Sequence, residues 1–172
     1  MASAHTRHET ERQVGDRLAD LPLDFEAMAV TSNLFRAANA VRSQLERSVL
    51  APHGLSWTAF VVLWVTWIWQ PVETRIIADE GAFSKATLTG VLKTLEAKKL
   101  AKRRKSPDDG RLVLVELTVK GEKLMRQLFP LFNAQESALV ASLTSSEQHT
   151  TAEALRKMTT LIEELDSSEP RQ

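Results

Sequence analysis

The chain contains no cysteine among its 172 residues. This absence excludes disulfide bonds, thiolate nucleophiles, zinc sites built on cysteine and thiol-based oxidant sensing. Long apolar runs are also missing, because the longest, residues 57–69, is shorter than the roughly 20 residues that cross a bilayer. Residues 1–23 are polar and mixed in charge, without the apolar core of a secretory signal. We therefore expect a soluble, cytoplasmic protein with no membrane partner.

Motifs of catalysis and cofactor binding are lacking as well. The four histidines show no metal-ligand spacing, and no glycine-rich phosphate loop follows a predicted strand. The sequence thus predicts that the protein is not an enzyme and has no metal or other cofactor.

Net charge is absent too, since 22 lysines and arginines balance 22 aspartates and glutamates, but the charge is unevenly distributed. Residues 98–111 hold seven basic residues against two acidic ones, a local charge of +5 that leaves −5 for the rest of the chain. A nucleic-acid partner is therefore conceivable for this segment, although whole-chain charge would not suggest one.

The periodicity that is present predicts one mainly helical unit. Apolar residues recur at three- and four-residue steps from Leu34 to Val49, which predicts a long first helix. Residues 57–69, capped by Ser56, are apolar on every side, so a helix there must be buried. Thr118 and Thr144 begin two further amphipathic helices near the end of the chain. Long helices at both ends predict the shared scaffold of a homodimer.

The central part has the pattern of a helix-turn-helix. A short helix at 73–80, a turn at 81–83 and a helix capped by Ser84 are followed by two short strands, 100–105 and 112–117, which form a hairpin. The expected fold is mainly α with a small β-hairpin wing, a winged helix-turn-helix with long N- and C-terminal helices as its dimerisation scaffold. The expected segments are a tail at 1–23, either disordered or extending the dimer contact; a first scaffold helix at 24–55; the winged helix-turn-helix at 56–118; the C-terminal dimerisation helices at 119–166; and a tail at 167–172.

The second helix of a helix-turn-helix lies in the DNA major groove with its N-terminal part facing base edges. Four apolar residues between 84 and 98 must face the core, namely Leu88, Val91, Leu92 and Leu95. The other side carries polar or basic residues that suit bases and phosphates, among them Ser84, Lys85, Thr87, Thr89 and Lys93. The alternative is that these side chains are merely solvated.

The hairpin adds a second candidate DNA contact. Its first strand is basic, with Arg103 and Lys105, and its turn ends at Arg111, which can enter the narrow minor groove where the potential is most negative. Asp109 lies two residues before Arg111 and can hold that side chain extended. The alternative is an ordinary surface turn built on Asp-Gly.

The order of these parts and several local strings resemble the MarR family (multiple-antibiotic-resistance regulators) of winged helix-turn-helix transcription factors. The matching stretches are LSWTAFVVL at 55–63, Ala78, residues 84–100, DDGR at 108–111 and VELTVKG at 115–121, within a resemblance that covers about residues 24–166. The resemblance implies an obligate triangular dimer on a pseudopalindromic double-stranded DNA operator, acting as a repressor. It also implies that the helix at 84–98 is the recognition helix and that Arg111 is the wing-tip arginine, with Asp109 as its partner.

Two departures from the family pattern stand out. Lys99 occupies the place after the recognition helix where the family often has glycine, so Lys99 must take a costlier left-handed conformation or the helix must end differently. The cysteine that oxidant-sensing members carry in the first helix is missing, which excludes that mechanism here.

The resemblance further implies an effector, a small aromatic or phenolic acid or a conjugate such as a coenzyme A thioester, that releases DNA. Candidate ligand-binding residues are Trp57, Phe60 and Trp64 as aromatic walls, Arg36 for an acidic group, and Asn39 and His53 as hydrogen-bond partners. Simple core packing is the alternative for each tryptophan. Two other functions remain open: a helical dimer whose basic hairpin docks an acidic protein, and a constitutive DNA binder without an effector.

Overall fold

The computed structural model describes residues 6–168, so the outer parts of the two predicted tails lie outside the described residues. The elements in chain order are α1 (Arg7–Arg17), α2 (Phe25–Leu45), a π-helical turn (Glu46–Leu50) and a 3₁₀ turn (Ala51–His53), α3 (Trp57–Trp69), β1 (Val72–Glu73), α4 (Thr74–Glu80), α5 (Lys85–Ala97), β2 (Ala101–Lys105), β3 (Val113–Leu117), α6 (Val119–Leu139) and α7 (Ser145–Ser168).

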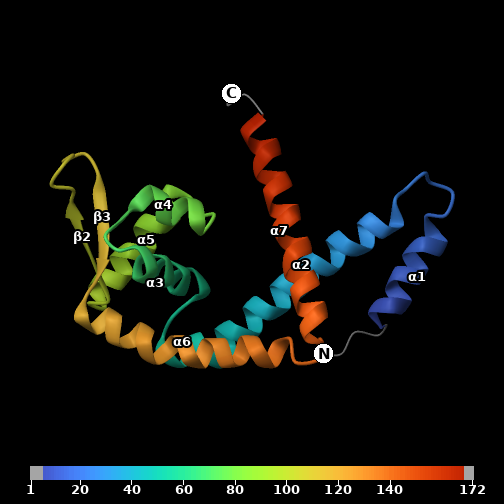
Figure 1. Ribbon diagram of the computed structural model, residues 1–172, viewed down its shortest axis with the longest axis horizontal. Helices are drawn as coiled ribbons and strands as arrows, with labels where there is room; N and C mark the ends of the chain where they lie inside the picture. The colour runs from blue at the N-terminus through green and yellow to red at the C-terminus, as the bar shows by residue number, and fades with distance from the viewer. Residues whose placement is uncertain (1–5, 169–172) are drawn as a thin grey trace.

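Figure 1 shows how these elements are arranged. Helices α3, α4 and α5 and the small sheet form a lobe at one end of the molecule, and α6 leads away from the sheet beneath that lobe. Helix α6 packs against α2 and against the turn that follows α2. Helix α7 then rises away from α6, and none of its residues is buried. The predicted arrangement of long terminal helices around a central helix-turn-helix is therefore confirmed.

The predicted helix starts are confirmed by their capping bonds. Ser56 accepts the backbone N–H of Ala59 at 3.2 Å, and Thr118 accepts that of Gly121 at 3.1 Å. Before α7, the backbone N–H and hydroxyl of Thr144 both donate to Glu147 Oε2 at 2.7 Å. The backbone N–H of Glu147 donates back to the threonine hydroxyl at 3.3 Å. Each side chain satisfies a backbone group that the first helical turn leaves unpaired.

The sheet has three strands, where the sequence predicted a two-stranded hairpin. Strands β2 and β3 pair antiparallel, with Ala101 opposite Leu117, and β1 adds to the other edge of β3, with Val72 opposite Val115. No sequence pattern predicts β1, because this strand has only two residues and is recognised by its pairing with β3 rather than by alternation of apolar and polar residues. The effect is to tie the start of α4 to the wing.

The core lies between α3, α5, β3 and α6. Leu63, Leu92, Leu95, Met125 and Leu128 are almost completely buried there. The expectation that the helix at 57–69 is buried on every side is wrong for its last turn, where two large apolar side chains, Ile68 and Trp69, stay exposed because the buried part of α3 ends at Thr66.

The predicted N-terminal tail contains an ordered helix. Helix α1 is capped by Thr6, and Glu11 on this helix accepts a 2.6 Å hydrogen bond from the side-chain amide of Asn33 on α2. Apolar periodicity missed α1 because its sequence is polar and the helix is held by tertiary contacts. Within residues 6–168, no single helix is long and apolar enough to cross a membrane; only α2 and α3 taken together, bent by 77°, meet that test.

Candidate nucleic-acid interface

Helix α5 presents the two faces that the sequence predicts. Leu88, Leu92 and Leu95 are buried and Val91 is half-buried. Every predicted DNA-contact position of this helix is exposed, namely Ser84, Lys85, Thr87, Thr89 and Lys93. The outer face of α5 is therefore available to a large ligand.

Hydroxyl groups at the start of α5 are already oriented by local bonds. Ser84 caps the helix by accepting the backbone N–H of Thr87 at 3.1 Å, and the two hydroxyl oxygens lie 2.8 Å apart. The Thr89 hydroxyl donates to the Lys85 carbonyl at 2.8 Å. Its lone pairs remain available to accept from a donor group on a partner.

The end of α5 is set by Lys99, which has a φ of 58°. The Lys99 N–H donates to the Glu96 carbonyl at 2.9 Å and the Leu100 N–H to the Leu95 carbonyl at 2.9 Å, the two bonds of a Schellman motif. Of the two predicted outcomes, the structure thus shows the costlier one, in which Lys99 is left-handed. Because glycine would adopt this conformation without a Cβ penalty, Lys99 retains backbone strain just before β2.

The recognition helix and the wing are joined by an ion pair that the sequence did not predict. Arg103 on β2 binds the Glu96 carboxylate of α5 with two hydrogen bonds, Nε to Oε1 at 3.0 Å and Nη2 to Oε2 at 2.6 Å. The hydrogen bonds from Arg103 hold the pKa of the Glu96 carboxyl below its ordinary value, although burial opposes this shift. Both side chains are about one-third exposed, so the pair is partly screened by water. This bidentate contact links α5 to β2.

A second carboxylate orders the outer edge of the wing. Glu116 on β3 accepts from Arg104 Nε at 2.6 Å and lies 3.1 Å from Lys102 Nζ. Hydrogen bonds from Arg104 and then Lys102 lower the pKa of the Glu116 carboxyl. Lys105 is exposed at the end of β2. Glu116 therefore offsets only one of the five positive charges of this segment, and the wing stays positively charged, with exposed cations at the strand end and in the turn.

At the wing tip, Asp109 holds Arg111 with three hydrogen bonds. Its Oδ1 accepts the backbone N–H at 2.9 Å and Nε at 3.1 Å, while Oδ2 accepts Nη2 at 3.1 Å. The hydrogen bonds from Arg111 lower the pKa of the Asp109 carboxyl. The Arg111 side chain is nevertheless 91% exposed. The predicted pair thus exists in the free protein, with the guanidinium extended into solvent.

The aromatic effector candidates pack mainly against one another and α6. Phe60 is only 4% exposed and its ring stacks on Phe132 with centroids 4.2 Å apart. Trp57 lies beside both rings, at 6.3 and 6.2 Å, and Trp64 contacts Trp69 edge-on at 6.4 Å. Phe60 belongs to the core, while Trp57 and Trp64 are partly accessible.

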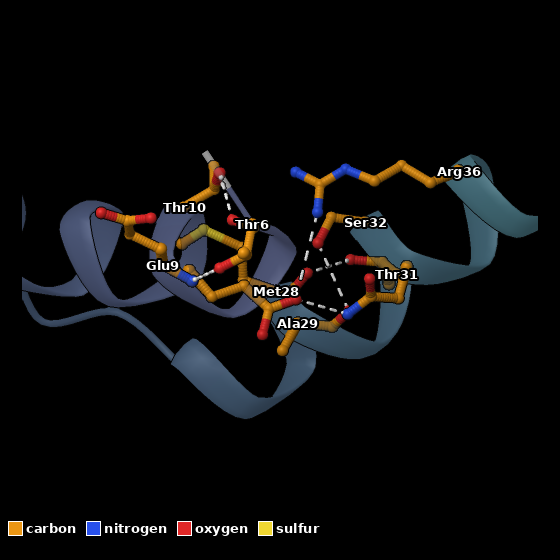
Figure 2. Close-up of polar contacts among 10 residues, drawn as sticks. Thr6, Glu9, Thr10, Met28, Ala29, Thr31, Ser32 and Arg36 are labelled. Atoms are coloured by element: carbon orange, nitrogen blue, oxygen red, sulfur yellow. Dashed lines mark hydrogen bonds and ion pairs between the residues drawn. The ribbon is translucent and has the colours of Figure 1, made fainter. Parts of the chain in front are cut away.

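The polar effector candidates lie on other elements. Arg36 and Asn39 are exposed on α2, and His53 Nδ1 is 2.9 Å from the Val49 carbonyl in the turn after α2. Arg36 lines a cavity between α1 and α2 that contains none of the other five candidates. The structure thus brings Arg36 together with α1 in this cavity (Figure 2), and no tryptophan lines it.

A second groove, of about 510 Å³, lies between α4, α5 and the wing. Thr89 and Arg103 are among the residues that line this groove. Sequence reasoning did not place a groove here, because it depends on the spacing of three elements. The Glu96–Arg103 ion pair lies beside it.

A helix-turn-helix with an exposed polar and cationic second helix, next to a basic wing, defines a winged-helix DNA-binding protein. A model of the MarR family matches residues 55–113. The HTH-type transcriptional regulator YwaE of Bacillus subtilis is 35% identical over 164 residues, which are 92% of this chain and 96% of that protein. The chain belongs to the MarR family of HTH-type transcriptional regulators, which is a non-enzymatic family.

Solved structures support the same fold. BpsR of Bordetella bronchiseptica, whose DNA binding is regulated by 6-hydroxynicotinic acid, superposes with a TM-score of 0.68 at 28% identity and covers 76% of this chain and 98% of that one. S. aureus MepR bound to DNA gives a TM-score of 0.68 at 25% identity, over 75% of this chain and 96% of that one.

Proposed function

We propose that this regulator binds a pseudopalindromic operator as a homodimer and represses transcription until an effector releases it. The observation that carries the DNA-binding part is the exposed face of α5 beside a wing tip whose arginine is already extended. Such a regulator works in the cytoplasm, where its operator is accessible.

On the operator, the start of α5 lies in the major groove. Lys85 and Lys93 bind phosphates or guanine edges, and Ser84, Thr87 and Thr89 contact bases and backbone through their hydroxyl groups. Arg111 enters the minor groove. Because Asp109 already holds the Arg111 side chain, ordering that side chain on DNA costs less rotamer entropy. Lys105 neutralises a phosphate. Arg103, which the sequence predicts as a DNA contact, also supports the wing through its ion pair with Glu96.

The apolar surface of the scaffold helices supports the homodimer. Helix α7 has 24 residues and none is buried, although Leu155, Leu161, Ile162 and Leu165 form an exposed stripe at helical spacing. Helix α2 carries a similar exposed pair, Val30 and Val41. Surfaces of this kind on a long helix are stable in water when a second copy covers them.

The effector part of the proposal rests on two supports, namely the relative BpsR, which is regulated by an aromatic acid, and the partly accessible tryptophans Trp57 and Trp64. Aromatic walls of this kind suit a planar acid or its thioester. Titration of operator-bound protein with aromatic acids tests this part, and unchanged operator affinity together with unchanged tryptophan fluorescence rejects it.

Selection of random duplex DNA by the purified protein, followed by titration of the recovered site at several salt concentrations, tests the DNA-binding part. We expect a two-fold symmetric site with half-sites about one helical turn apart and an affinity that falls steeply with salt. Weak binding without sequence preference contradicts the proposal and favours a wing that docks an acidic protein. Sequence-specific binding that no acid or thioester changes indicates a constitutive DNA binder.

A further inference from the structure

The C-terminal end of the recognition helix α5 is bonded to two other parts of the chain. Lys98, the residue that ends α5, donates through its side-chain ammonium to the Gly54 carbonyl at 2.5 Å. Gly54 follows the 3₁₀ turn after α2 and lies 44 residues earlier in the chain. The Lys120 ammonium of α6 in turn donates to the Lys98 carbonyl at 3.0 Å. Two lysines thus connect the end of α5 to α6 and to the segment that follows α2.

The backbone beside these lysines is held by the start of α6 as well. The Thr118 hydroxyl donates to the Lys99 carbonyl at 2.6 Å, and the Thr118 N–H donates to the Leu100 carbonyl at 3.0 Å. The last carbonyls of a helix have no partner within the helix, so bonds from outside decide how firmly such an end is held. We call these contacts together the α5 junction, which is made by residues 54, 98–100, 118 and 120.

Lys98 and Lys120 differ in their partners from the neighbouring cations of the wing. Lys102, Arg103 and Arg104 pair with carboxylate side chains. Lys98 and Lys120 instead donate to backbone carbonyls, which move only with the backbone itself. A cation at the C-terminal end of a helix also interacts favourably with the helix dipole. The bonds of these two lysines therefore constrain the place where α5 ends.

The constraint at this end of α5 affects the other end, which faces base edges in the proposed complex. Helix α5 has 13 residues, so it is about 20 Å long. Over that length, a tilt of about 10° around Lys98 displaces the N-terminal end by about 3–4 Å. A hydrogen bond to a base edge does not survive such a displacement. A small loss of constraint at the junction is therefore enough to disturb base readout.

We propose that Lys98 and Lys120 are positioning residues that set the orientation of the recognition helix relative to the scaffold through the α5 junction. Along its length α5 packs against α3, α4 and β2, which belong to the same lobe. Helices α2 and α6 belong to the expected dimer scaffold, so the junction relates the arrangement of the dimer to the helix that reads DNA. The inference rests on the proposed operator binding and adds the residues that orient the reading helix.

The double variant Lys98→Met/Lys120→Met tests these roles, because methionine keeps an unbranched side chain and removes the charged donor. We expect operator affinity to fall about tenfold or more, since two charge-assisted hydrogen bonds are lost. Affinity for random-sequence duplex is expected to change no more than in a charge-matched control, because that binding depends on phosphate charge and not on helix orientation.

The matched control is Lys123→Met/Arg126→Met, which removes two positive charges from exposed positions on α6. Within residues 6–168, Lys123 has no hydrogen bond or ion pair, and Arg126 has only a 3.7 Å pair with Glu122. Salt dependence separates positioning from direct contact, since each lysine that neutralises a phosphate contributes about one unit to the salt slope. The lysine variant is expected to keep the slope of the control, and a slope lowered by about two overturns the inference.

Helix orientation can also be measured without DNA. The chain has no cysteine, so Ala86→Cys on α5 and Gln127→Cys on α6 place two spin labels at exposed positions. Labelled full-length protein is diluted with unlabelled protein, so that label pairs within one chain dominate the pulsed EPR signal. We expect one narrow distance distribution in the labelled parent and in the control, and a broader or displaced distribution in Lys98→Met/Lys120→Met.

An unchanged distance distribution in the lysine variant, or an operator affinity equal to that of the control, overturns the inference. Urea midpoints are measured on all samples, and where the double variant is less stable the single variants Lys98→Met and Lys120→Met repeat both measurements. If the parent selects no DNA sequence, the proposed function is rejected and the distance measurement still decides the junction. Operator binding by the parent with an unchanged distribution in the variant rejects the junction and keeps the function.

Discussion

The dimer interface can be tested by replacing Leu161 and Leu165 with glutamine. The two leucines lie four residues apart on α7, and each is 57% exposed in the single chain. Glutamine has nearly the same helix propensity as leucine, so the change removes apolar surface and leaves the helix itself favourable.

The expected loss follows from the exposed area that the partner would cover. Full burial of a leucine side chain contributes about 1.5–3 kcal/mol, so covering somewhat over half of one contributes about 1 kcal/mol. A two-fold interface contains both leucines from both copies, and the double variant should therefore lose about 4 kcal/mol of dimerisation free energy. This loss corresponds to about a thousandfold increase in the dimer dissociation constant.

Sedimentation velocity over a wide range of protein concentration measures this constant. Thr160→Gln places the same side chain on the opposite side of α7 and is expected to leave the dimer unchanged. Equal dissociation constants for the parent and the double variant would refute the assignment of this stripe to the dimer interface.

Four further substitutions test the wing and its supports. Arg111→Ala is expected to weaken operator binding by about 1–3 kcal/mol without changing dimer stability, and Asp109→Asn by less, because the arginine remains but is no longer held; fluorescence anisotropy at fixed salt measures both. Gly121→Ala is expected to destabilise the fold by about 1–3 kcal/mol, since a Cβ there would come within 2.0 Å of the Leu100 carbonyl oxygen. Lys99→Gly should stabilise the fold by about 1 kcal/mol, because glycine adopts the left-handed conformation without strain. Urea unfolding measures both, and a midpoint for Lys99→Gly at or below that of the parent contradicts the account of the α5 terminus.

Much of the fold was predictable because its signals are local. A cap such as Ser84 or Thr118 acts within three residues of itself, and the apolar residues of α5 recur within about two turns, from Leu88 to Leu95. The Asp109–Arg111 pair was also predictable, since only one residue separates the two side chains. The conformation of Lys99 was predicted as one of two outcomes, because a helix that ends there needs a left-handed residue.

The effector residues were less predictable, because a pocket depends on how elements from distant parts of the sequence meet. Arg36 was predicted to bind the effector together with the tryptophans, and the structure places it beside α1, a helix that apolar periodicity missed. Phe60 had the right spacing for a pocket wall, yet its ring is stacked on Phe132 from a helix 72 residues later in the chain.

The sequence by itself determined the helix-turn-helix, the hairpin, the caps and the basic wing tip, because each depends on residues a few positions apart. Only the tertiary structure decided the third strand, the Glu96–Arg103 link between recognition helix and wing, and the cavity between α1 and α2. Each of these requires side chains from separate elements to approach within a few ångströms, and that approach is set by the packing of the whole core.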